Sequence, residues 1–234
     1  MRLRSGTSGF SYRAWKGTFY PADLTSEAML RFYGERLGAV EVDSTFYRIP
    51  KASTLVAWSG QVPADFRFAL KAPQRVTHEQ RLQGSAESLA YFYRVAAELG
   101  AKLGAVLFQL PPFLKKDLPR LMAFLELLPA GGRAAFEFRH RSWLEDNVFE
   151  ALRKHNAALC AAEAEEIEVP LVPTATWGYL RLRRPHYSGG ELQAWAERIL
   201  EQPWDETFVF FKHEDGATGP QLALALSSLV EAKP

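Results

Sequence analysis

The sequence has little cysteine, no long apolar run and no excess of charge of either sign. Its single cysteine, Cys160 in the run "NAALCAA", cannot form an internal disulfide, which excludes a disulfide scaffold and favours a reducing compartment. We expect Cys160 to be a small buried side chain. The 28 Lys and Arg residues nearly balance the 27 Asp and Glu residues, and the net charge of +1 creates no global attraction to nucleic acid or membranes.

Membrane and secretion signals are also missing. No stretch approaches the ~18–20 apolar residues of a membrane span, and the N-terminus "MRLRSGTSGF" contains no apolar signal core. We therefore expect a cytoplasmic protein that has no membrane partner.

Several common catalytic and binding motifs do not occur. There is no GxGxxG or GxxxxGK[ST] loop, which disfavours the usual nucleotide-binding open sheets. There is no GxSxG elbow, and Cys160 lies in an apolar run, so serine and cysteine nucleophiles are disfavoured. HxH, HExxH and CxxC spacings are absent as well.

What the sequence does contain is a regular alternation of strand-like and helix-like segments. Eight short apolar runs predict strands, at residues 2–6, 39–43, 66–70, 105–110, 134–138, 157–162, 177–182 and 207–212. Between them, apolar residues recur at spacings of three and four, which predicts helices over 26–37, 85–99, 117–128, 143–155 and 189–202. Alternating strands and helices favour parallel pairing with right-handed crossovers.

Eight such units in 234 residues predict an α/β fold, a TIM-like (β/α)8 barrel. No Gly-, Ser- or Pro-rich linker divides the chain, so we expect residues 1–234 to form a single domain.

Alternation along the predicted strands points charged side chains at the barrel axis. In "AVEVD", Val40 and Val42 suit the helix layer, which leaves Glu41 and Asp43 facing inward. The same reasoning turns other polar residues inward: Arg67, Lys71, Gln109, Glu137, Arg139, Tyr179, Arg181 and Lys212. Barrel interiors are normally filled by apolar side chains, and active sites of this fold lie at the C-terminal strand ends, where most of these residues fall.

The loops that follow the strands add further candidates. His78, His140 and His213 follow three different strands, and Trp143 lies in "FRHRSW". The first loop holds five aromatic residues within eleven positions. These aromatics either pack as a lid over the helix ends, or Tyr12 and Trp15 stack on a ligand.

Seven segments together resemble the DUF72 family, also called YecE-like. They are "GTSGFSYRAWKGTFYP", "VEVDSTFYRIP", "FRFALKAPQRVTHEQRL", "LGAVLFQLPP", "FEFRHRSW", "HNAALC" and "YLRLR", in this order over essentially the whole chain. The resemblance implies a TIM-like barrel and supplies no reaction. The chain departs from the family pattern after "YLRL", where Arg183 and Arg184 stand instead of His-Gly, and this strengthens the cationic side of the expected site.

The leading hypothesis is an enzyme that uses acid/base carboxylates, with Lys and Arg, to act on a small anionic substrate. Mixed charges at close range shift pKa values apart, as proton transfer requires, and guanidinium groups bind phosphate or carboxylate in a bidentate way. The catalytic candidates are Glu41, the first choice, with Glu137, Asp43 and Lys71. The candidates for substrate binding are Tyr12, Trp15, His78, Gln109, Arg139, Trp143, Arg181, Lys212 and His213.

Three alternatives remain open at the level of sequence. The inward charges could form a structural ion-pair layer, although buried pairs contribute little to stability. The carboxylates and His78 could bind a divalent metal for sugar isomerisation or phosphodiester hydrolysis, although no cofactor is expected. The aromatic first loop beside basic residues could belong to a non-catalytic nucleotide- or nucleic-acid-binding module, which the net charge disfavours. The oligomeric state is not determined by the sequence.

Overall fold

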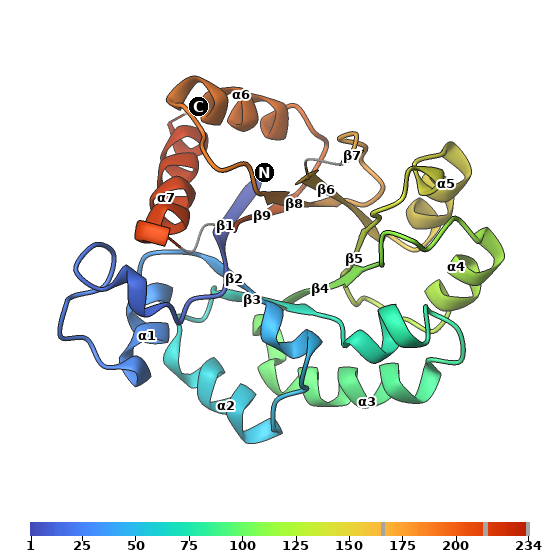
Figure 1. The fold of residues 1–234 in the computed structure, drawn as a ribbon, viewed down its shortest axis with the longest axis horizontal. Coiled ribbons are helices and arrows are strands. Elements are labelled where there is room, and N and C mark those ends of the chain that lie inside the picture. The colour runs from blue at the N-terminus through green and yellow to red at the C-terminus, as the bar shows by residue number, and fades with distance from the viewer. Residues whose placement is uncertain (165–166, 213–214, 233–234) are drawn as a thin grey trace.

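A ring of eight parallel strands closes into a barrel (Figure 1). The computed structural model describes residues 1–164, 167–212 and 215–232. The barrel strands are β1 (Arg2–Ser8), β2 (Ala39–Val42), β3 (Arg67–Lys71), β4 (Leu103–Gln109), β5 (Ala134–Glu137), β6 (Ala158–Ala164), β8 (Trp177–Leu182) and β9 (Glu206–Phe211). Pairing of β5 with β6 and of β1 with β9 closes the ring, which confirms the predicted barrel.

Helices surround the strands on the outside of the ring (Figure 1). They are α1 (Met29–Gly34), α2 (Ala52–Gln61), α3 (Ala86–Ala96), α4 (Leu118–Leu125), α5 (Asp146–Lys154), α6 (Gly189–Leu200) and α7 (Thr218–Glu231). The connection from β6 to β8 differs from the predicted repeat. Its described residues contain no helix, only the short strand β7 (Ile167–Glu168), which pairs antiparallel with β6.

Local signals explain where two of these helices begin and end. Helix α6 starts in a capping box, in which Ser188 accepts from the backbone N–H of Glu191 and the Glu191 carboxylate accepts from Ser188. Helix α3 follows Ser85, as predicted, and continues as a tighter turn over Ala97–Lys102. Gly100 adopts a φ of +56° there, which favours glycine, and its non-helical backbone interrupts the turn.

Two apolar layers result from the alternation of side chains along the strands. Val40, Val42 and Phe136 pack outward against the helices, as predicted. The barrel interior is filled by a second cluster, which we call the barrel plug: Ala39, Ala69, Ala105, Leu107, Ala135, Ala158, Cys160, Ala162, Trp177, Tyr179, Phe208 and Phe210. Cys160 is buried and free, as predicted, and burial raises the pKa of its thiol well above the usual value. Within the described residues, every helix is too short or too polar to cross a membrane.

The close approach of β1 to β2 generates a stability prediction. A Cβ atom on Gly6 would lie 1.9 Å from the carbonyl oxygen of Ala39 and 2.9 Å from the Tyr33 hydroxyl, so Gly6→Ala forces the strands apart. We expect it to lower the free energy of unfolding by about 1–3 kcal/mol or more in urea denaturation.

Gly60→Ala is the matched control, because Gly60 lies in helix α2 and a Cβ there meets no atom within 4 Å. This control should stabilise the protein by roughly 0.5–1 kcal/mol. Equal effects of the two substitutions would contradict the close approach.

Candidate active site

A buried ion-pair layer lies on the C-terminal side of the barrel plug and centres on Arg181 of β8. Its Nε and Nη2 atoms donate to Glu41 Oε1 at 3.0 and 2.6 Å, and its Nη1 donates to Glu137 Oε2 at 2.6 Å. Arg181 is 1% exposed and Glu41 is 0% exposed. Three strands, β2, β5 and β8, are therefore joined by one guanidinium group.

Neighbouring polar side chains complete the hydrogen bonding of both carboxylates. Ser8 donates to Glu41 Oε1 at 2.5 Å and Tyr179 donates to Glu41 Oε2 at 2.6 Å. Gln109 donates to Glu137 Oε1 at 2.8 Å. Each of the four carboxylate oxygens thus accepts at least one hydrogen bond, which offsets part of the cost of burying the charges.

The protonation states in this layer follow from its charges. Burial by itself lowers the pKa of Arg181, but Glu41, Glu137 and Asp43 outweigh it, and the pKa is raised well above its usual value. Burial, together with the negative charge of Glu41, raises the pKa of Tyr179 well above its usual value. Arg181 therefore stays charged and Tyr179 keeps its proton for Glu41.

Asp43 and Lys71 form a second, more accessible pair above this layer. Asp43 opens the short turn Asp43–Phe46 after β2 and its side chain is 29% exposed. Its Oδ1 lies 3.8 Å from Lys71 Nζ and 3.4 Å from Arg181 Nη2. Thr45 fixes the loop, because its hydroxyl contacts the carbonyl oxygens of Val42 at 2.9 Å and Lys71 at 2.7 Å.

The pKa values of this pair move toward each other. Burial, followed by the negative charge of Glu41, raises the pKa of Asp43 despite the opposing effects of Arg181, Lys71 and Lys212. Burial also lowers the pKa of Lys71, and Arg181 adds to this lowering. Converging pKa values in an accessible acid and base are typical of groups that transfer protons.

An aromatic ring, a histidine and an arginine surround the Asp43–Lys71 pair. Lys71 lies over the ring of Phe46 at 4.4 Å, and His78 contacts the same ring edge-on at 4.9 Å. Burial, then the charges of Lys71 and Arg139, lower the pKa of His78, so its imidazole is neutral at pH 7. The side chain of Arg139 is half-buried and forms no ion pair or hydrogen bond with any described residue.

Arg183 also belongs to this region, although it was not among the predicted site residues. Its Nη1 lies 3.6 Å from Glu137 Oε1, and its buried Nε has no hydrogen-bond partner among residues 1–164, 167–212 and 215–232. Lys212 is exposed beyond the end of β9. We call the accessible group the mouth cluster: Asp43, Lys71, His78, Arg139, Arg183 and Lys212.

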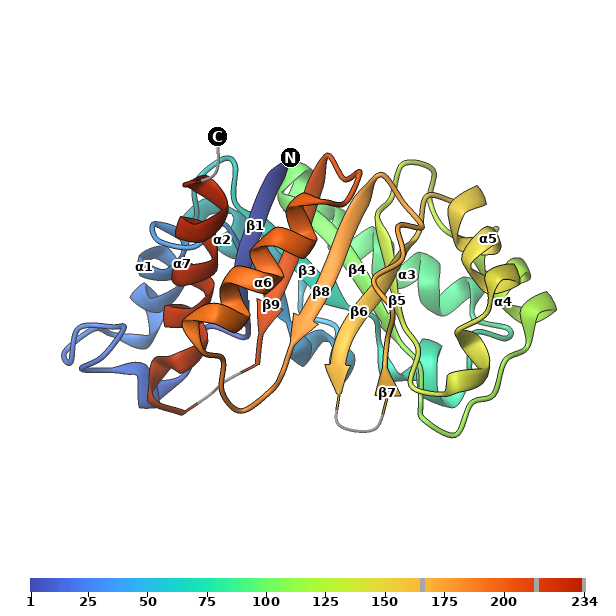
Figure 2. The same cartoon turned by 90° about the horizontal axis from the view of Figure 1, so that it is seen from above.

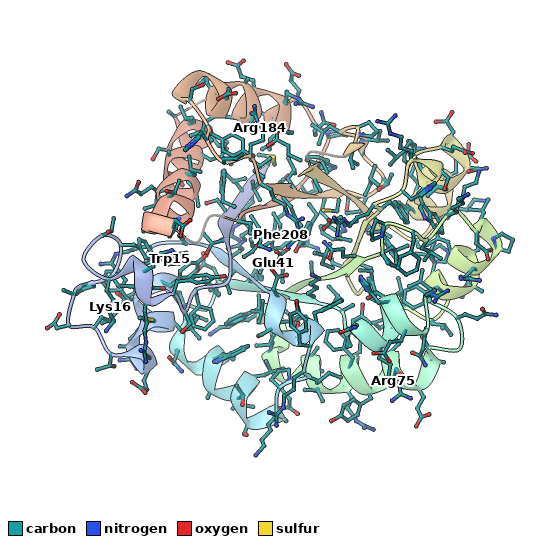
Figure 3. The ribbon with its side chains drawn as sticks, in the orientation of Figure 1. Trp15, Lys16, Glu41, Arg75, Arg184 and Phe208 are labelled. Atoms are coloured by element: carbon teal, nitrogen blue, oxygen red, sulfur yellow. The ribbon has the colours of Figure 1, made fainter. Side chains whose placement is uncertain are left out.

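Some predicted site residues lie elsewhere. Trp15 is 0% exposed and packs against Tyr12 and Tyr20, outside the ring of strands that holds Glu41 and Phe208 (Figure 3). Trp143 is fully buried too, stacked on a phenylalanine of the outer layer. Neither ring presents an open face here, so the structure gives no support to their predicted role in ligand binding, which stays a prediction. The lid interpretation of the first loop fits better.

Three other predicted binding residues, Tyr12, Gln109 and His213, also lie outside the mouth cluster or outside the described residues. Tyr12 is half-buried, and its hydroxyl donates to the carbonyl oxygen of Ser8 at 2.8 Å. Gln109 contributes to the buried layer rather than to the mouth cluster. His213 lies outside the described residues.

Two signals in the sequence could have found the missed residues. Strand β1 extends to Ser8, two residues beyond the predicted end, and Ser8 pairs in register with Glu41. Side chains two positions apart on a strand share a face, so the inward direction of Tyr179 and Arg181 also predicts that Arg183 faces inward.

Comparison with known proteins matches residues 4–234 to the profile of DUF72, a protein family of unknown function. The UPF0759 protein YecE of Escherichia coli (strain K12) is 27% identical over 229 residues, covering 84% of this chain and 84% of that protein. The crystal structure of a DUF72 family protein from Thermotoga maritima MSB8 is similar, with a TM-score of 0.87 and 27% identity, covering 99% of this chain and 100% of the other.

A more distant solved structure is a methyltransferase from Methanosarcina mazei, with a TM-score of 0.56 and 11% identity, covering 98% of this chain and 93% of that one. At this identity the likeness concerns the fold alone.

The ion-pair layer generates a second stability prediction. Arg181→Met would leave Glu41 and Glu137 buried without their shared cation, and we expect it to lower the free energy of unfolding by about 3–5 kcal/mol in urea denaturation. Arg120→Met is the control, because within the described part of the chain Arg120 forms an ion pair only with the solvent-accessible Asp117, at 3.1 Å, and such pairs contribute about 0–1 kcal/mol. Similar losses in both variants would contradict a central role for Arg181.

The raised pKa of Asp43 predicts a pH dependence of stability. An acid whose pKa is higher in the folded than in the unfolded protein destabilises the fold once pH rises above the unfolded value, about 3.9. Asp43→Asn removes this effect, so the variant should gain stability relative to wild type as pH rises from that value through the folded-state pKa. Urea denaturation across this range measures the difference, and a difference that is constant or reversed would contradict a raised pKa.

Proposed function

The chain belongs to the DUF72 family of proteins of unknown function, and from its mouth cluster we propose that it is an enzyme that acts on a small substrate bearing a phosphate or carboxylate group. The observation that carries the proposal is the Asp43–Lys71 pair, an accessible acid and base whose pKa values converge beside guanidinium donors that have no hydrogen-bond partner among the described residues.

The charges of the mouth cluster support an anionic substrate. Four cations face the single carboxylate of Asp43, a surplus of three positive charges. The buried layer of two carboxylates and one guanidinium reduces the surplus to two. Arg139 and Arg183 both have guanidinium donors without partners among the described residues, and such donors bind oxyanions in a bidentate way.

Acid/base chemistry would then fall to Asp43 and Lys71. In its carboxylate form Asp43 takes a proton from a carbon or hydroxyl next to the bound anionic group, and the electron pair stays on the substrate. The Lys71 ammonium stabilises the negative charge that develops on a neighbouring oxygen. The reverse reaction returns the proton from Asp43.

The proposal gives Glu41 and Glu137 a positioning role rather than the acid/base role expected from the sequence. Their oxygens accept hydrogen bonds from Arg181 and its neighbours, and neither carboxylate reaches solvent. Through Arg181 they hold Asp43 in place, and the charge of Glu41 raises the pKa of Asp43.

Metal-assisted chemistry is not part of the proposal. Across the described part of the chain, no three His, Cys, Asp or Glu side chains gather in an arrangement that could hold a metal ion. The Arg181 guanidinium contacts Glu41, Asp43 and Glu137, and a cation there competes with a metal for the same oxygens.

Turnover by variants tests the proposal. A panel of small phosphorylated and carboxylated compounds is incubated with the protein, and 1H and 31P NMR identify any compound that is converted. Asp43→Asn and Lys71→Met should each reduce kcat for that compound by about 10²-fold or more, because general acid/base groups contribute on this scale.

Lys154→Met serves as the control, since Lys154 is exposed at the end of helix α5, away from the mouth cluster. It should leave kcat unchanged. Turnover that survives in both Asp43→Asn and Lys71→Met would overturn the proposal, as would a panel in which nothing is converted or bound.

A further inference from the structure

A charged pocket lies at the N-terminal end of the barrel, opposite the mouth cluster, because its lining includes residues at the starts of strands. In Figure 2 strands β6 and β8 point away from the edge where the N-terminus lies, so their starts lie toward that edge. The volume of the pocket is about 340 Å³, and its lining includes Arg67 at the start of β3, Gly104 at the start of β4, Arg133 just before β5 and Glu206 at the start of β9. Tyr93 of helix α3 forms another wall. We call it the basal pocket.

Positive charge exceeds negative charge around the basal pocket. Among the described residues, ion pairs in this region join Arg2, Arg4 and Arg133 to the carboxylates of Asp65 and Glu206. Arg67 interacts electrostatically with the same groups, so four cations meet two carboxylates, a surplus of two. Both oxygens of Glu206 are already engaged, one by Arg4 Nε at 2.7 Å and the other by Arg133. The carboxylate that lines the pocket is therefore occupied, and the surrounding guanidinium groups keep donors to spare.

The guanidinium of Arg67 has donors available at the pocket wall. Among the described residues it donates only through Nη1, to the main-chain oxygens of Ala64 and Phe66 at 3.2 and 2.9 Å. Its Nε and Nη2 atoms have no partner there, so they are available to an acceptor in the pocket that Arg67 lines.

The walls of the basal pocket hold its arginines in place. A Cβ atom on Gly104 would lie 2.9 Å from Arg67 Cβ and 3.0 Å from the Phe208 ring, so only glycine allows Arg67 to lie this close to β4. The Arg133 guanidinium lies 5.6 Å from the Trp177 ring and 5.9 Å from the Phe208 ring. Burial, and then the charge of Arg4, lowers the pKa of Arg67, an effect that a bound anion would oppose.

We propose that the basal pocket binds a small oxyanion, a phosphate or carboxylate group, through the guanidinium groups of Arg67 and Arg133. Ligand pockets span about 300–1,000 Å³, so a pocket of about 340 Å³ holds one small ligand. The site is separate from the mouth cluster, because the barrel plug lies between the two, and it does not depend on the proposed enzymatic function.

Isothermal titration of the whole protein with inorganic phosphate, and separately with succinate, tests the site at constant ionic strength adjusted with NaCl. Arg67→Gln should weaken binding of the preferred anion about tenfold or more, because it removes a charged donor. Tyr93→Phe should leave binding unchanged, because the buried hydroxyl is closed to the pocket. Arg120→Gln, in the first turn of helix α4 and outside the pocket lining, should change nothing.

The mouth variant Lys71→Met separates the two sites. Under the proposal it leaves the component of binding that Arg67→Gln weakens unaltered, whatever becomes of turnover. The inference is overturned if neither phosphate nor succinate binds, if NaCl alone reproduces the heat, or if Arg67→Gln folds normally and binds as wild type does. Loss of all binding in Lys71→Met would likewise assign the anion to the mouth cluster.

Discussion

The contact of one guanidinium group with two buried carboxylates determines how the charged groups are arranged at the C-terminal end of this barrel. Arg181 satisfies Glu41 and Glu137 together, and the cost of burying these charges falls only because the three groups share hydrogen bonds. A hydrophobic layer would be as stable or more stable, so stability alone does not account for the arrangement. What the layer adds is a fixed negative charge beneath Asp43, and this charge raises the pKa of Asp43.

The position and the pKa values of the accessible Asp43–Lys71 pair depend on this buried layer. Asp43 contacts Arg181 at 3.4 Å and Lys71 at 3.8 Å, so its position depends on both the buried guanidinium and the next strand. The same packing removes Lys71 from water, which lowers its pKa. The pKa values of an acid and a base that are far apart as free amino acids are thereby brought toward each other.

Strand alternation accounts for the charged residues at both ends of the barrel interior. Strand alternation that brings Glu41 and Arg181 inward at one end brings Arg67 inward at the other, with the apolar plug between them. At each end a carboxylate is already paired with arginine, and other cationic donors remain available to a ligand. The anion binding that we propose at the two ends therefore rests on where charged residues fall on inward-facing strand positions, not on any phosphate-binding loop.

The sequence by itself determined the barrel, the eight strands and the inward direction of Glu41, Glu137 and Arg181, because side-chain alternation and apolar spacing are local properties of the chain. Only the tertiary structure decided which acid reaches solvent. Whether Glu41 or Asp43 is accessible depends on hydrogen bonds from Ser8 and Tyr179, residues 33 and 138 positions away from Glu41. The burial of Trp15 was likewise beyond the sequence, since an aromatic loop residue packs inward or outward according to neighbours that only the closed fold assembles.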